Sequence, residues 1–225
     1  MKIVMKRFIA YLIDVLIVTI ISTFITSNTY INKDYKKYLE TYESYDAFYE
    51  EYEDSKESLE ETLEYESITE DEYEEKLEKL NSDFDKKNID YNYKLIKLSV
   101  VTTIISILLV LLYFVVIEYY MGGKTIGKKI MKLRVVSNSG KKLNILNYLL
   151  RSLILNSVLI NILSVVFVLV LSKSGYLIYN NIIYVVDYVI EVAMVTMLCF
   201  NKDNRSLHDF IANTKVVWEG EKNEV

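Results

Sequence analysis

The chain has 225 residues, 52% of them hydrophobic, and a formal net charge of −5. Residues 30–95 carry 22 acidic residues and 9 lysines (net −13), and the remainder carries 17 basic and 9 acidic residues (net +8). One cysteine excludes an intrachain disulfide, and one histidine excludes a His-rich metal site. With no proline and only 6 glycines, helix is little interrupted anywhere.

Four apolar segments are long enough to cross a membrane, since a helical span needs roughly 20 mostly apolar residues. They are residues 8–26, 98–117, 152–172 and 176–200. The second and third contain no charged residue, the first contains only Asp14, and the fourth contains Asp187 and Glu191. We therefore predict an all-α membrane protein with four transmembrane helices.

Basic residues predict the orientation of these spans, because cytoplasmic loops are enriched in lysine and arginine. They cluster before the first span, between the second and third, and after the fourth, so four spans put every cluster on one side. Both termini are then cytoplasmic in a protein of the cell membrane, and the acidic segment is extracellular. The predicted divisions are 1–29 (first span), 30–95 (ectodomain), 96–118 (second span), 119–150 (basic loop), 151–201 (third and fourth spans) and 202–225 (tail).

The acidic segment has the periodicity of two helices. Tyrosines at positions 35, 38, 42, 45, 49 and 52 are spaced 3, 4, 3, 4, 3, and Leu59 and Leu63 resume the series. A second series follows at Tyr73, Leu77, Leu80 and Phe84. Between them, Thr69 and Glu72 have the spacing of a capping box, which marks a helix start. Each series would form a seam, that is, a stripe of large side chains along one face of a helix. The two seams predict two long helices that fold back as an antiparallel, coiled-coil-like hairpin.

Three interpretations of this hairpin stay open. It is an acidic spacer between two spans, a diffuse surface that collects cations, or an arm that recognises a cationic peptide or protein. In the last case Tyr35, Tyr42 and Tyr49 are the candidate partner-binding residues, since tyrosine offers both a ring and a hydroxyl.

The basic loop predicts a helix and a strand pair. Residues 125–133 fit an amphipathic helix with Ile126, Ile130 and Leu133 toward the membrane. The lysines expected to contact anionic head groups are Lys124, Lys128, Lys129 and Lys132. The following LRVVSNSGKKLNI fits a small cytoplasmic β-hairpin with SNSG as its turn, and TKVVW near the end is a candidate strand to pair with it. A GxxxxGK match precedes Lys129 where a phosphate loop needs Ser or Thr, so we expect no nucleotide site.

The carboxylates within the spans need a physical reason, because each costs roughly 2.5–3.5 kcal/mol at a span centre. Asp14, Asp187 and Glu191 are the candidates for one proton or cation site, in which burial raises a carboxyl pKa enough for proton exchange. The structural alternative is a polar cluster that orients the helices, with Arg7 and Arg151 against Asp14 and with Asn156 or Asn161 hydrogen-bonding across spans.

Three blocks of the sequence resemble the RDD family of bacterial membrane proteins: KRFIAYLIDVLIV, GGKTIGKKIMKLRVVSNSGKKLNILNYLLRSLI and DNRSLHDFIANTKVV. The resemblance covers residues 2–27 and 97–218. It implies that Arg7 and Asp14 are the family's named arginine and first aspartate, and that Arg151 is the arginine that opens the third span. The second aspartate is assigned to Asp209, with Asp187 as the alternative. Gly127 and His208 lie in the second and closing blocks. The acidic segment is a departure, since the family's first loop is usually shorter.

The resemblance implies a transport-related role, and some members of the family have been assigned cation/proton antiport. The alternative is a membrane-anchored binding or scaffold protein whose ectodomain captures a cationic partner. Ser206, His208 and Asp209 are adjacent in sequence, which does not make a catalytic triad, and we expect no enzyme. We also expect no cofactor, no bound metal and no nucleic-acid partner. The expected partners are the lipid bilayer and, since four spans make a small transporter, further copies of the chain.

Overall fold

The structure, a computed structural model, describes residues 2–65 and 68–219, so residues 220–225 of the predicted tail lie outside it. The chain divides into two compact units. The first, called here the helical unit, comprises Met1–Ser27 and Thr102–Val225, and the second comprises Asn28–Val101. Each unit is described by itself.

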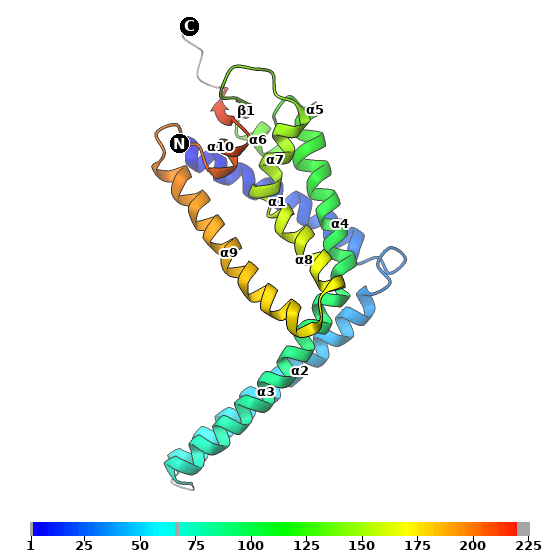
Figure 1. Ribbon diagram of the computed structural model, residues 1–225, viewed down its shortest axis with the longest axis vertical. Coiled ribbons are helices and arrows are strands. Elements are labelled where there is room, and N and C mark those ends of the chain that lie inside the picture. The colour runs from blue at the N-terminus through cyan, green and yellow to red at the C-terminus, as the bar shows by residue number, and fades with distance from the viewer. Residues whose placement is uncertain (1, 66–67, 220–225) are drawn as a thin grey trace. The chain divides into compact units, whose positions relative to one another are not determined.

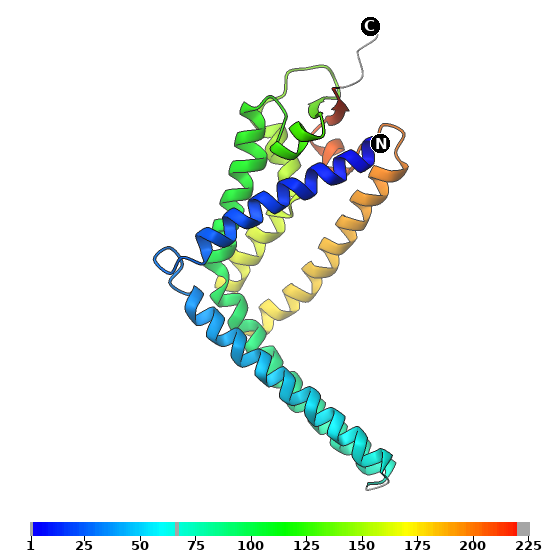
Figure 2. The same ribbon diagram turned by 180° about the vertical axis from the view of Figure 1, so that it is seen from behind.

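The apolar segments form several of the long helices of the chain (Figures 1 and 2). Among the described residues, three helices are long and apolar enough to cross a membrane. The number rises to four if a bent pair of helices is counted as one span. The three are α1 (Ile3–Thr26), the continuous run Val100–Tyr120, and α9 (Lys173–Phe200). The second run consists of α4 (Val100–Leu111), the π-helix η1 (Leu112–Ile117) and α5 (Glu118–Tyr120). These helices support the prediction that the chain is a membrane protein.

The third predicted span, residues 152–172, is bent in the structure and consists of two helices. Helix α7 (Ile145–Leu155) and helix α8 (Val158–Val170) meet at an angle of 67°. Ser157 lies between them in the left-handed region at φ 48°. The break frees backbone oxygens, and the Tyr11 hydroxyl on α1 donates to the Leu155 carbonyl (3.3 Å) and to Oδ1 of Asn156 (3.4 Å). The expected hydrogen bond from Asn156 across spans is therefore confirmed.

A small sheet closes one end of the helical unit. Strand β1 (Leu133–Ser137) pairs antiparallel with β2 (Thr214–Trp218), so that Leu133 lies opposite Trp218. Leu133, Val135 and Val216 are buried there in a core that also contains Ala10 and Tyr148. Two short helices, α6 (Ile126–Ile130) and α10 (Leu207–Ile211), flank this sheet. We call this end of the unit the sheet end.

Two predictions for this region are corrected. The local β-hairpin is wrong, because Asn144 caps α7 through a capping box with Asn147 and thereby commits the second half of the predicted hairpin to helix. The other candidate partner, TKVVW, is the one that pairs. Leu133 does not face the membrane, because it is buried beneath the sheet, whereas Ile126 and Ile130 are exposed.

The second unit is an antiparallel pair of helices, α2 (Tyr35–Glu64) and α3 (Glu70–Leu98). The capping box of Thr69 and Glu72 starts α3 as predicted. The predicted seam brings Tyr52 against Phe84, with ring centroids 4.0 Å apart. Phe48 joins this stack at 5.3 Å from Phe84, although the seam omitted it.

Asparagine side chains on α3 accept hydrogen bonds from two half-buried tyrosines of the seam, which gives their hydroxyl groups polar partners. Tyr45 donates to Asn88 Oδ1 at 3.1 Å, and Tyr52 donates to Asn81 Oδ1 at 2.8 Å. The paired helices match the predicted hairpin, and its extracellular placement stays a prediction.

Candidate functional site: a charged cavity at the sheet end

Asp209 is held in place by the start of α10. Ser206 and Asp209 form a capping box, in which the Ser206 N–H donates to Oδ2 of Asp209 at 3.2 Å. The Ser-x-x-Asp spacing puts the carboxylate at the third helical position, where it satisfies a free backbone N–H. Asp209 is fully buried as a result.

Two arginines from distant parts of the chain converge on this one carboxylate. Nη2 of Arg7 on α1 lies 2.7 Å from Oδ2 of Asp209, and Nη1 of Arg151 on α7 pairs with Oδ1. Thr214 on β2 completes the cluster by donating to Oδ1 at 3.2 Å and accepting from Arg151 at 2.7 Å. Burial works against ionisation of Asp209, but the charges of Arg151 and Arg7 hold its pKa well below the usual range. The carboxylate is therefore ionised and joins α1, α7 and α10.

His208 lies beside this cluster as a neutral imidazole. Burial and the positive charge of Arg151 lower the pKa of His208 well below its ordinary value. Its Nε2 lies 3.4 Å from Nη2 of Arg7, which can only donate, and 3.6 Å from Oδ2 of Asp209. The shorter contact, with the arginine, favours the tautomer in which Nε2 accepts and Nδ1 carries the proton. Nδ1 is buried and has no hydrogen-bond partner among the described residues.

Asp14 docks α6 onto α1. Its carboxylate accepts hydrogen bonds from the hydroxyl of Tyr113 (2.6 Å), the N–H of Gly127 (2.7 Å) and Oγ1 of Thr125. Gly127 permits this approach, since a Cβ at that position would lie 2.1 Å from the Ala10 carbonyl oxygen. The proposed cluster of Arg7 and Arg151 against Asp14 is therefore wrong: both arginines pair with Asp209 instead.

Two of the four candidate lipid-contacting lysines have partners within the protein. Nζ of Lys128 lies 2.8 Å from Oε1 of Glu118 in a buried ion pair, so its predicted head-group contact is wrong. Nζ of Lys124 lies 2.6 Å from Oε1 of Glu219. Lys129 and Lys132 are exposed and stay candidates for head-group contact.

The three candidate carboxylates do not assemble into one cation site. Among the described residues, no group of three His, Cys, Asp or Glu side chains is placed to hold a metal ion. Asp14 accepts hydrogen bonds from Gly127 of α6 and from Tyr113. Asp187 accepts a hydrogen bond from Oγ of Ser157 at 2.8 Å. Glu191 is exposed within the chain and forms no hydrogen bond or ion pair with the described residues.

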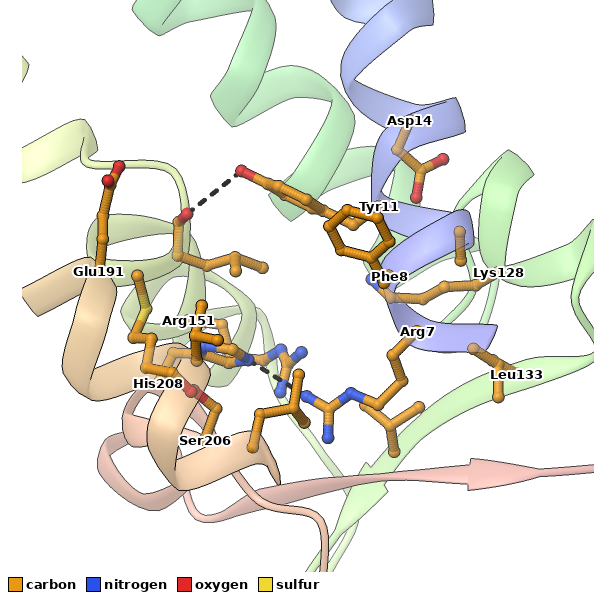
Figure 3. Close-up of a pocket in the computed structure, with 16 residues that line it drawn as sticks. Arg7, Phe8, Tyr11, Asp14, Lys128, Leu133, Arg151, Glu191, Ser206 and His208 are labelled. Atoms are coloured by element: carbon orange, nitrogen blue, oxygen red, sulfur yellow. Dashed lines mark hydrogen bonds between the residues drawn. The ribbon is translucent and has the colours of Figure 1, made fainter. Parts of the chain in front are cut away.

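A cavity of about 270 Å³ joins several of these groups. Its polar wall includes Arg7, Arg151, His208 and Lys128, and Glu191 and Asp14 also line it. Figure 3 shows Glu191 on α9 lying across the cavity from Asp14 on α1. The remaining lining side chains are mostly apolar: Phe8, Ala10, Leu133, Leu155, Met194, Val195, Leu198 and Val216.

Sequence reasoning missed four residues of this region: Tyr113, Thr125, Glu118 and Thr214. Two of them had a readable signal. Thr125 precedes a short helix, and its side chain accepts from the Lys128 N–H, as an N-cap does. Glu118 is an acid at the boundary of an apolar span and a basic loop, where an ion pair is favoured. Tyr113 and Thr214 carry no such signal, because only the fold brings them to Asp14 and Asp209.

Comparison with known proteins identifies the family. No curated protein and no solved structure matches the chain significantly. The RDD family profile matches residues 3–213, which include the clusters around Asp14 and Asp209. The pairing of Asp209 with both arginines favours it over Asp187 as the family's second aspartate. The chain is a membrane protein that belongs to the RDD family.

Proposed function

We propose that this protein is transport-related and exchanges protons for cations, with Glu191 as the carboxyl group that gains and loses the proton. The observation that carries the proposal is Glu191, a carboxylate on a membrane-crossing helix that lines a cavity and has no hydrogen-bond or ion-pair partner among the described residues. Ionisable residues inside a membrane segment are costly, and they commonly mark ion pathways or proton relays.

The position of Glu191 suits this role. It lies nine residues before Phe200, the last residue of α9, which puts it about 14 Å from that end of the helix at 1.5 Å per residue. Asp14 and Asp187 are less suited, because hydrogen bonds from their neighbours hold each carboxyl group in place. The three-carboxylate hypothesis is thereby reduced to one working group.

The test is proton flux into proteoliposomes that contain the purified chain and an internal pH-sensitive dye. A sodium or potassium gradient should drive proton movement in the wild type, and Glu191→Gln should reduce its rate at least about tenfold, since general proton transfer by a positioned group typically contributes that much or more. Asp187→Asn is the matched control one turn away on α9, and it should retain most of the flux. Undiminished flux in Glu191→Gln would contradict the proposal.

A second function is favoured by the surface of the second unit. Tyr42 and Tyr49 are 48% and 44% exposed on α2, in a segment whose net charge is −13. Exposed tyrosines among carboxylates suit recognition of a cationic peptide or protein through ring contacts and charge. We propose this as a role that coexists with transport.

This role is tested by binding of a fluorescent oligolysine peptide to the full-length protein in detergent. The double variant Tyr42→Ala, Tyr49→Ala should weaken the affinity for the peptide more than twofold, after the salt-dependent, nonspecific part of the binding has been subtracted. Lys36→Ala with Lys86→Ala, which removes exposed charges from the same unit, is the control and should strengthen binding slightly. Equal binding by wild type and the tyrosine variant would exclude these tyrosines as the recognition site.

A further inference from the structure

His208, on the polar wall of the cavity, has a buried ring nitrogen that lacks a hydrogen-bond partner among the described residues. His208 is 4% exposed, and its protonated Nδ1 is one of the buried polar atoms without a partner among the described residues. A buried N–H without an acceptor is unfavourable, so such groups in native proteins are normally paired with protein, water or ligand. The missing partner of His208 is an atom that accepts a hydrogen bond.

The charge around His208 favours an anion as that partner. Arg7 and Arg151 share the single carboxylate of Asp209, which leaves an excess of one positive charge immediately around His208, although Asp14 and Glu191 also line the cavity. The nearby Lys128 is already neutralised by Glu118 and adds no further excess. An oxyanion next to His208 would accept the Nδ1–H and balance the second arginine.

The rest of the cavity favours an apolar group attached to that anion. Glu191, Met194, Val195 and Leu198 form one face of α9, at the i, i+3, i+4, i+7 spacing of a helical stripe, and line the cavity. Three of these four side chains are apolar, and Phe8 and Leu155 line it from α1 and α7. At roughly 30 Å³ per water-sized group, a volume of about 270 Å³ holds a head group and a short stretch of chain.

The helices that form the cavity indicate that the apolar group of the ligand extends into the membrane. Both α1 and α9 are apolar enough to cross a membrane, and Val195 is 62% exposed at the edge of the cavity. A chain that leaves the cavity past Val195 therefore meets the hydrocarbon that surrounds α9. An amphiphile is retained by both its charge and its chain.

We infer that the cavity binds an anionic amphiphile, with a phosphate monoester or carboxylate head beside His208, Arg7 and Arg151 and an apolar chain along α9. The site uses the arginine and histidine wall and does not depend on proton exchange at Glu191. It is a binding site for lipid-like anions, whichever solute the protein transports.

The experiment measures thermal stabilisation of the purified full-length chain in a nonionic detergent by dodecyl phosphate, followed through the loss of helical circular dichroism on heating. Dodecyl phosphate should raise the melting temperature in a saturable way. His208→Leu removes the donor and should weaken the apparent affinity about tenfold, the usual effect of losing a hydrogen bond to a charged group. Val195→Trp, which fills the edge of the cavity without touching the charged wall, should abolish the stabilisation.

Three further arms make the result decisive. Val192→Trp, on the same helix but outside the cavity lining, should respond as the wild type does. Inorganic phosphate and dodecanol, which supply the head and the chain separately, should stabilise far less than dodecyl phosphate. Equal stabilisation by either one, or an equal response from Val195→Trp and Val192→Trp, would overturn the inference.

Glu191→Gln separates the two proposals, because it should reduce proton flux at least about tenfold and leave dodecyl phosphate binding intact. Loss of binding in this variant would contradict a site built on the arginine and histidine wall.

Discussion

Replacing Gly127 with alanine is expected to undo the docking of α6 onto α1. The added Cβ would lie 2.1 Å from the carbonyl oxygen of Ala10 and 2.9 Å from Cγ of Asp14. The Ala10 oxygen belongs to the backbone of α1, so it cannot move aside as the end of a flexible side chain would. Relief of the clash therefore requires α6 to move away, which also lengthens the 2.7 Å hydrogen bond from Gly127 to Asp14.

The magnitude follows from these two effects. Overpacking of a tight contact costs about 1–3 kcal/mol. A hydrogen bond to a charged group contributes about 1.5–3 kcal/mol. Together they predict a loss of about 2.5–6 kcal/mol in the free energy of unfolding, a large part of the 5–15 kcal/mol or so of a typical native protein. For a chain of this size, roughly 2–4 °C per kcal/mol gives a fall in melting temperature of about 5 °C or more.

The assay is thermal unfolding of the purified chain in nonionic detergent, followed by the fluorescence of Trp218. Trp218 packs against the sheet-end core, and Nζ of Lys6 lies 3.4 Å from the centre of its ring. The control is Gly175→Ala in the first turn of α9, where the nearest side-chain atom to an added Cβ is Oγ of Ser172 at 3.3 Å. Alanine there should leave the stability unchanged or slightly increased. A melting temperature of Gly127→Ala within about 2 °C of the wild type would refute the reasoning.

Three further predictions concern the charged cluster and the hairpin. Asp209→Asn leaves Arg7 and Arg151 buried without an anion, and should cost about 3–5 kcal/mol; a monodisperse size-exclusion peak with wild-type melting would contradict this. The pKa of His208 is lowered by burial and by Arg151 in the folded chain. As the pH falls, this imidazole is therefore protonated in the unfolded chain at a higher pH than in the folded chain. Stability from this group is fully present above about pH 6.5 and is lost as the pH falls below it, so melting at stepped pH should show a decline that His208→Gln reduces. Phe84→Ala removes the ring that stacks on α2 and should cost about 3 kcal/mol or less, since the ring is only partly buried; limited proteolysis should then cleave within residues 28–101 sooner than in the wild type.

The elements that depend on local pattern were predictable. The apolar runs around α1, η1 and α9 were read from composition, and the 3,4 spacing of tyrosines predicted the pairing of α2 and α3. The capping box at Thr69 marked the start of α3 to the residue. Such features follow from hydrophobic periodicity and from short-range hydrogen bonds, which act over a few residues of sequence.

The break in the third span was not predictable from the same signals. Neither proline nor glycine lies near Ser157, which adopts φ 48° between α7 and α8. The bend is stabilised from outside the segment, by the hydroxyl of Tyr11 at the freed carbonyl of Leu155. A contact between residues 144 positions apart leaves no trace in local periodicity.

The sequence by itself determined that this is a membrane protein of the RDD family, with apolar helices and an inserted acidic helical pair. Only the tertiary structure decided how its charges are used: Asp14 holds α6, Lys128 pairs with Glu118, and both arginines meet on Asp209. The physical reason is that ion pairing in a low-dielectric interior depends on distance in space and on burial. Spacing along the chain determines neither of these. The sequence therefore shows which residues are charged, and the tertiary structure determines which of them pair.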